Sequence, residues 1–328
     1  MKINSVPSLF LFVFAIFSLS SENALPQVHF SAAEIKPETK NTDSFYFFRP
    51  VAIAYDEKCL FILDSEDGEI KVFSKSGAFL YSFGRKGQGP GEFHMPSDMD
   101  ILGHRIFVAD GANRRIQVLD KKGSFIGGFS VPFWPQWILA LEAEKIVLGS
   151  LPSGFSGQEK VLHCFNARGE LLWQAIDSYF SGDAVYDLMR NRAFLRKGTG
   201  GDFFFIRSSD DRIIRQLNKD GAVIREIGVV KAYPLKEIAL PLRGGRKKNL
   251  TSFCWNCAVE AGRFYLLVPR FTPDQDLGPG REVAVVDGAG NIEAFIDLPT
   301  EMTRIAVEGE RIYGLDGESR LRLLVMKK

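Results

Sequence analysis

Asp98 and Asp100 are two carboxylates whose spacing in the sequence could do chemistry. In a β-strand, residues i and i+2 point to the same face, so these side chains would lie together. In "PSDMDIL", apolar packing of Met99 and Ile101 would turn both carboxylates the other way. Carboxylate oxygens are ligands for a hard cation such as Ca²⁺, which takes about 6–8 oxygens. Arg304 is a candidate counter-charge.

A second group of candidates is cationic and lies in segments that read as loops. The glycine-rich "GRKGQGPGEFH" and the turn in "VADGANRRIQV" supply three of them, Arg85, Lys86 and Arg114. The insertion 230–250 supplies four more: Arg243, Arg246, Lys247 and Lys248. These residues could contact an acidic partner, or they could belong to plain solvated loops. Phosphate cradling by 84–94 is not favoured, because Walker spacing is absent and no helix follows.

Aromatic and sulfur-containing side chains are further candidates. The insertion 177–192 carries Tyr179, Phe180 and Tyr186, which could add aromatic contacts. "CWNC" at 254–257 lies in a β context rather than at a helix N-terminus, so it reads as two buried structural thiols. The four histidines fall in different parts of the chain, and no nucleophile motif is present.

The elements that must position these groups are repeated. Five segments share a strand, a polar turn ending in glycine and another strand, with the glycines at 77, 123, 169, 221 and 290. The first two intervals are equal, at about 46 residues, which is typical of propeller blades. A near-continuous apolar strand precedes each hairpin, as in "CLFILD" and "RIFVAD", and such strands are buried on both faces. The pattern predicts an all-β, six-bladed β-propeller with four antiparallel strands per blade.

The last repeat ends without its fourth strand. We expect the N-terminal segment to supply it, by pairing residues near Val28–Ala33 with residues near Arg322–Met326. Such a closure would remove an open sheet edge. In this arrangement, Asp98, Asp100 and Arg304 face the central channel.

The motif "GRKGQGPGEF", followed by "IFVADGANRRIQVLDKKGSFIGGF", resembles the NHL-repeat family and similar bacterial six-bladed β-propellers. The pattern D-x-x-N-x-R-I is complete at Asp110, Asn113, Arg115 and Ile116. The resemblance is strongest over 48–130 and implies the fold first, since the family includes binding scaffolds as well as a few lyases and lactonases.

The N-terminus differs from the rest of the chain. The apolar run "LFLFVFAIFSL" over 9–19 suits a secretory signal, so we expect residues 1–24 to be a signal peptide and 25–328 to be the propeller. An uncleaved signal anchor is the alternative. The first cysteine is Cys59, which leaves no N-terminal cysteine for lipid anchoring. Four cysteines in an exported chain do not make a disulfide framework.

Composition narrows the function. With 41 Lys and Arg against 40 Asp and Glu, no net field favours nucleic acid. The sequence therefore indicates an exported binding or scaffold protein of the periplasm or cell surface, without a cofactor and without a transmembrane domain beyond the signal. Its partner would be a protein or another extracytoplasmic ligand. The alternative is a metal-assisted hydrolase or lyase in the channel, with a divalent cation on Asp98 and Asp100.

Overall fold

The glycine hairpins fold as the repeats indicate. The computed structural model describes residues 28–34, 47–142, 144–152, 159–209, 211–241, 247–271 and 277–327. In it, Gly77 and Gly123 have φ of 85° and 90°. A residue with a Cβ is strained in this left-handed region, so glycine is what permits these tight turns. The flanking strands pair antiparallel, and each hairpin carries a β-bulge.

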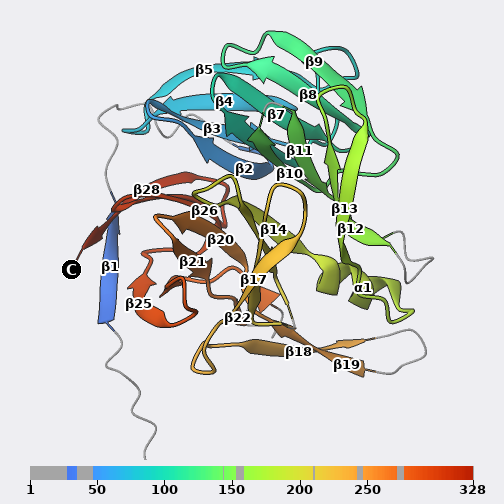
Figure 1. Ribbon diagram of the computed structural model, residues 1–328. Coiled ribbons are helices and arrows are strands. Elements are labelled where there is room, and N and C mark those ends of the chain that lie inside the picture. Colours follow the sequence, from blue (N-terminus) through green and yellow to red (C-terminus); the bar gives the residue numbers. More distant parts are fainter. Residues whose placement is uncertain are drawn as a thin grey trace, which may run out of the picture.

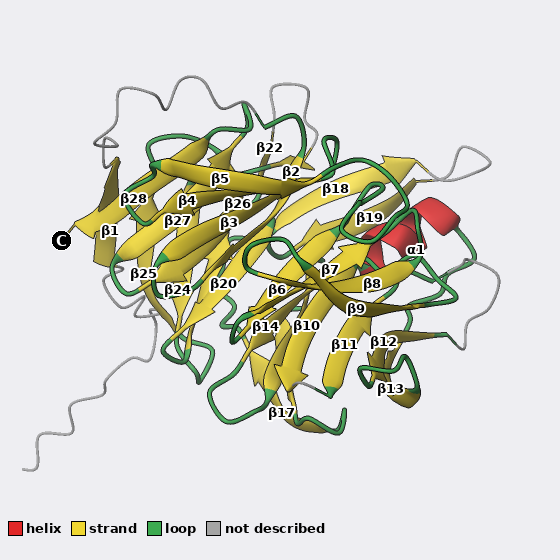
Figure 2. Ribbon diagram, turned by 90° about the horizontal axis from the view of Figure 1, so that it is seen from above, coloured by secondary structure: helices red, strands yellow, loops and turns green. Residues whose placement is uncertain are grey.

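Four-stranded sheets surround a central axis as the blades of a propeller (Figures 1 and 2). Blade 1 consists of β2 (Pro50–Tyr55), β3 (Cys59–Asp64), β4 (Glu69–Ser74) and β5 (Phe79–Gly84). Blade 2 consists of β6 (Asp98–Leu102), β7 (Arg105–Asp110), β8 (Arg115–Asp120) and β9 (Phe125–Ser130). Blade 3 consists of β10 (Trp137–Glu142), β11 (Lys145–Gly149), β12 (Lys160–Phe165) and β13 (Leu171–Asp177).

The second half of the chain completes the ring. Blade 4 consists of β14 (Ala193–Lys197), β15 (Phe203–Arg207), β16 (Ile213–Leu217) and β17 (Val223–Gly228). Blade 5 consists of β20 (Asn256–Glu260), β21 (Arg263–Leu267), β24 (Glu282–Val286) and β25 (Ile292–Asp297). Blade 6 consists of β26 (Met302–Glu308), β27 (Arg311–Asp316), β28 (Leu321–Lys327) and β1 (Val28–Glu34).

The predicted closure is confirmed. β1 pairs antiparallel with β28, and Ala32 lies opposite Met326. The first half of β1 also pairs in parallel with β25, so blades 5 and 6 form one eight-stranded sheet. Figure 1 shows β1 at one edge of the molecule beside β28 and β25. The two ends of the propeller thus hold each other, and one further pairing ties in the preceding blade.

The core lies between the blades. Alternate residues of β3 face opposite neighbours: Leu60 and Ile62 pack with Tyr313 of blade 6, whereas Phe61 packs with Val108 of blade 2. The described residues form six such buried clusters, each of which joins two adjacent blades. This two-sided burial is why the second strands read as continuous apolar runs.

One face of the propeller carries the connectors between blades and the turns between second and third strands, and we call it the connector face. The insertions lie on this face. Between blades 3 and 4 lies the helix α1 (Ala184–Asn191), which the sequence analysis did not anticipate. Between blades 4 and 5, the basic insertion forms a hairpin of β18 (Lys236–Pro241) and β19 (Lys247–Ser252). Blade 5 contains a short hairpin of β22 (Arg270–Phe271) and β23 (Leu277–Gly278).

Candidate functional site

The glycine-rich connector 84–94 is held by the turn of blade 2. Asp110 is fully buried, and its Oδ2 accepts from Arg115 Nε at 2.8 Å and from Asn113 Nδ2 at 2.8 Å. Arg115 also donates to the carbonyl oxygens of Gly89 and Glu92, at 2.8 and 2.9 Å. The repeat motif therefore fixes the connector.

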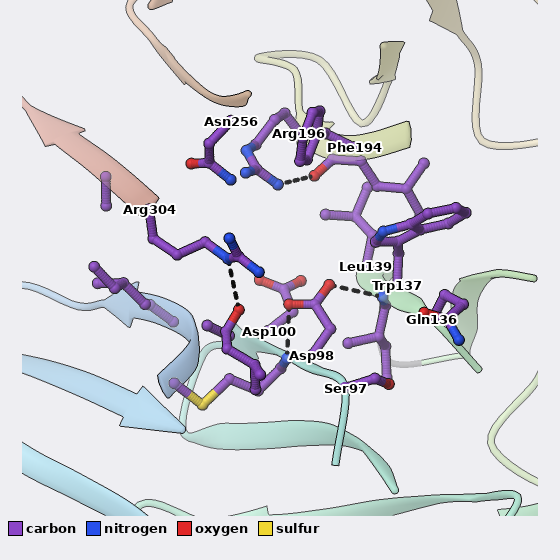
Figure 3. Close-up of a pocket in the computed structure, with 18 of the residues that line it drawn as sticks. Ser97, Asp98, Asp100, Gln136, Trp137, Leu139, Phe194, Arg196, Asn256 and Arg304 are labelled. Carbon is purple, nitrogen blue, oxygen red and sulfur yellow. Dashed lines mark hydrogen bonds between the residues drawn. The ribbon is translucent and has the colours of Figure 1, made fainter. Parts of the chain in front are cut away.

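The inner strands enclose a cavity of about 750 Å³. Asp98 and Asp100 of β6, Arg196 of β14 and Arg304 of β26 line it (Figure 3). Trp134 also lines it, from the connector before β10, and other lining residues lie in α1. The cavity therefore reaches the connector face. The structure places all three residues predicted for the channel at this cavity.

The two carboxylates bind the neighbouring inner strand. Asp98 Oδ2 accepts from the backbone N–H of Ile138 at 3.1 Å, and Asp100 Oδ2 accepts from that of Ala140 at 2.8 Å. Asp100 also lies 2.9 Å from Lys197 Nζ. These contacts satisfy N–H groups on the channel-facing edge of β10. They also occupy oxygens that a cation would need.

Two arginines make the matching contacts to carbonyl groups. Arg196 Nε donates to Cys257 O at 2.8 Å, and its Nη1 donates to Leu195 O at 2.7 Å. Arg304 Nε donates in the same way to Val51 O at 3.0 Å, and its Nη1 to the preceding carbonyl at 2.8 Å. Each side chain thus joins its inner strand to that of the next blade.

Burial and charge shift the pKa values of these groups. Burial raises the pKa of Asp98 to about 6, although the charge of Arg196 and two backbone N–H groups oppose the shift. Burial lowers the pKa of Arg304 to about 10, and the like charges of Arg192 and Arg196 lower it further. Burial also lowers the pKa of Arg192. The channel lining therefore carries more positive than negative charge, and burial disfavours the ionised form of Asp98 within it.

The proposed divalent cation stays a hypothesis. Within the ranges that the structure describes, no group of three or more His, Cys, Asp or Glu side chains is placed to hold a metal ion. The two thiols of "CWNC", Cys254 and Cys257, are free and buried, and burial raises the pKa of both. They are protonated thiols at neutral pH, in agreement with a structural role.

Five of the cationic residues predicted for the loops are described, and they lie at separate places on the connector face. Arg85 pairs with Glu92, and Lys86 Nζ lies 3.3 Å from Glu66. Arg114 is exposed, in the turn of blade 2. Two others, Lys247 and Lys248, lie on β19, between blades 4 and 5. The remaining pair, Arg243 and Arg246, lies outside the described residues.

Helix α1 and the basic hairpin are in direct contact. Lys248 Nζ lies 4.2 Å from the centre of the Tyr186 ring, and the Tyr186 hydroxyl donates to Asn249 O at 3.1 Å. Figure 2 shows α1 beside β19. Tyr186 is only 3% exposed, so it supports the hairpin rather than offering an aromatic contact to a partner. Phe180 is exposed. The helix has a sequence signal that we missed, the cap Asp183, which accepts from the N–H groups of Val185 and Tyr186.

One hydrogen-bonded Ser–His pair was also missed. Ser150 Oγ lies 2.9 Å from His163 Nε2, and Gln174 Nε2 lies 2.9 Å from His163 Nδ1. Such a pair could activate a nucleophile. However, Ser150 and His163 are 6% and 8% exposed, and neither lines the cavity. The pair links strands of blade 3.

Comparison with known proteins identifies the family. A profile of the family described as "6-bladed beta-propeller" matches residues 20–208, more than half of the chain. The chain belongs to this 6-bladed beta-propeller family. No curated protein matches it significantly in sequence.

Solved structures share the propeller fold at low sequence identity. A Bacteroides fragilis protein, named as a predicted exported protein, has 13% identity and a TM-score of 0.60, with 92% of this chain and 99% of that one covered. A virginiamycin B lyase from Staphylococcus aureus has 12% identity and a TM-score of 0.54, with 91% and 99% covered. These likenesses show the fold alone. No helix in the described ranges of this propeller has the length and apolar character needed to cross a membrane.

Proposed function

We propose that this propeller is an exported binding protein whose partner, a protein or another ligand outside the cytoplasm, docks on the connector face. The observation that carries the proposal is the exposure of apolar side chains at the channel mouth. Trp134 and Leu188 line the cavity yet are 37% and 46% exposed, and Val185 on the same helix is 59% exposed. Apolar side chains that gather around a cavity mark interaction sites on soluble proteins.

Charge and sequence support the same face. Lys247 is exposed on β19, and this strand contacts α1 through the hydrogen bond from Tyr186 to Asn249 O. A partner with both apolar and acidic groups would therefore fit this face. The NHL-type motif over 84–130 supports a scaffold role, as in the binding members of that family. The apolar run over 9–19 supports export, in agreement with the name of the Bacteroides fragilis protein.

Two sets of substitutions test this placement. One set replaces Trp134, Val185 and Leu188 with Ser, and the other replaces Arg243, Arg246, Lys247 and Lys248 with Ser. A control replaces the exposed outer-strand residues Val223 and Ile224. After chemical crosslinking in the periplasm, we expect the wild type and the control to recover the same partner and both sets to lose it. Equal recovery from every variant would contradict the placement.

The melting temperature must be followed in parallel. Replacement of Lys248 removes a contact with the Tyr186 ring, so we expect a small decrease for the basic set. Lys247→Ser alone serves as the matched variant, because Lys247 is exposed and should leave the melting temperature unchanged.

A further inference from the structure

The charge of the channel differs from that of the protein. The charged residues that line the cavity are five cations against two carboxylates, although the chain as a whole is nearly balanced: Arg49, Arg192, Arg196, Lys197 and Arg304 against Asp98 and Asp100. Asp100 is paired with Lys197. Asp98 is then the one lining carboxylate, among the described residues, left to balance the arginines.

The guanidinium groups of Arg196 and Arg304 are fixed by hydrogen bonds, and each keeps one nitrogen that could donate to a ligand. Arg196 and Arg304 each use Nε and Nη1 on backbone carbonyls. Within the described part of the chain, Nη2 of each has no hydrogen-bond partner. A side chain that is already ordered loses little conformational entropy when a ligand binds. Guanidinium groups also match the geometry of carboxylate, sulfate and phosphate oxygens.

Arg192 is the least satisfied of the three arginines. It lines the cavity, and its guanidinium group has no hydrogen bond or ion pair with any other described residue. Its backbone carbonyl accepts from the N–H group of Ser208 at 2.9 Å. Its guanidinium carbon lies 5.4 Å from the centre of the Trp255 ring. Arg192 is partly buried, and this burial lowers the pKa of its guanidinium group. An anion bound in the channel would stabilise the charged form.

We propose that the channel binds a small organic anion, whose acidic group is held by Arg192, Arg196 and Arg304. The acidic group is a carboxylate, sulfate or phosphate. The rest of the ligand is apolar, because Trp137, Leu139 and Phe194 form the adjoining wall (Figure 3). The cavity volume of about 750 Å³ is typical of a small-molecule site. Trp134 and Leu188 of the proposed partner surface line the mouth of the same cavity, whereas the anion would contact the three arginines.

Calorimetric titration with phenyl phosphate tests the site, with phenol as the neutral analogue. We expect phenyl phosphate to bind the wild type and phenol not to bind. Arg192→Met should weaken binding by about tenfold or more, the effect of losing one charge-assisted contact. Arg168→Met removes the same charge from an exposed turn of blade 3 and should bind like the wild type.

Arg192→Met is the main variant because it removes no hydrogen bond that the structure shows, so it should fold. Arg304→Met also removes contacts between blades, and its melting curve must therefore accompany its titration. The proposal is overturned if Arg192→Met binds phenyl phosphate as tightly as the wild type. It is also overturned if phenyl phosphate, phenyl sulfate and benzoate all fail to bind at millimolar concentration. Neither result bears on the connector-face substitutions, which remove no channel arginine.

Discussion

Lys197 Nζ lies 2.9 Å from Asp100 Oδ2 and joins the inner strands of blades 4 and 2, which are not neighbours in the ring. The same ammonium donates to Ile101 O at 2.6 Å. The contact passes over the inner strand of blade 3, whose Ala140 N–H also donates to Asp100. Three blades therefore meet at one carboxylate.

Lys197→Met should lower the free energy of unfolding by about 1 kcal/mol, because the pair is partly exposed and screened by solvent. Urea denaturation measures the change. The control is Lys160→Met, which breaks a 2.6 Å pair with Asp177 that is more exposed and should have almost no effect. Equal losses in the two variants would show that Lys197 has no special role in the channel.

The stability of the wild type should depend on pH through Asp98. The pKa of Asp98 is about 6 in the folded protein, against the usual 3.8, so the folded state retains a proton that the unfolded state releases. This stabilisation is present at low pH and is lost as pH rises through the interval from 3.8 to about 6. Relative to Asp98→Asn, the wild type should lose up to about 3 kcal/mol across that interval. A pH-independent difference between the two would contradict the assigned pKa.

Asp110→Ala should be among the most destabilising single changes in the connector face. It leaves Arg115 and Gln117 without their shared carboxylate, and loss of one partner of a buried pair costs about 3–5 kcal/mol. Asp120→Ala is the control, because that carboxylate caps an exposed turn and should contribute about 1 kcal/mol or less. Thermal and urea unfolding would rank the two variants. The reverse order would contradict the anchoring role of Asp110.

Closure by β1 can be tested with one buried and one exposed position. Ala32 is buried against blades 5 and 6, so Ala32→Asp should lower the free energy of unfolding by about 3 kcal/mol. Ser31→Asp, one residue away and exposed, should change it by less than about 0.5 kcal/mol. If both variants unfold like the wild type, β1 does not hold the ring closed.

The fold could be predicted from the sequence because its signals are local and repeated. Glycine at each hairpin and two-sided burial of strands such as β3 specify a blade without reference to its neighbours. The partner of the last blade followed from its missing strand. The parallel pairing of β1 with β25 could not be predicted, since it depends on how closely blade 5 approaches the closure.

The channel was predicted only in part. Alternation placed Asp98 and Asp100 at the cavity, and the same rule applied to Phe194 and Arg196 in "AFLRK" would have found Arg196. Arg192 was missed because it ends an insertion that read as an irregular loop. Arg192 follows the last residue of α1, and its place at the cavity depends on the path of this helix, which the sequence pattern did not indicate.

The central claim, binding at the connector face, is tested most directly by photo-crosslinking in the cells that make the protein. A benzophenone amino acid is placed at Leu188, on the exposed surface of α1, and in a separate variant at Ile224 on the outer strand of blade 4. Our account predicts a discrete crosslinked product from position 188 and none from position 224. No product from position 188, or the same product from both positions, would contradict it.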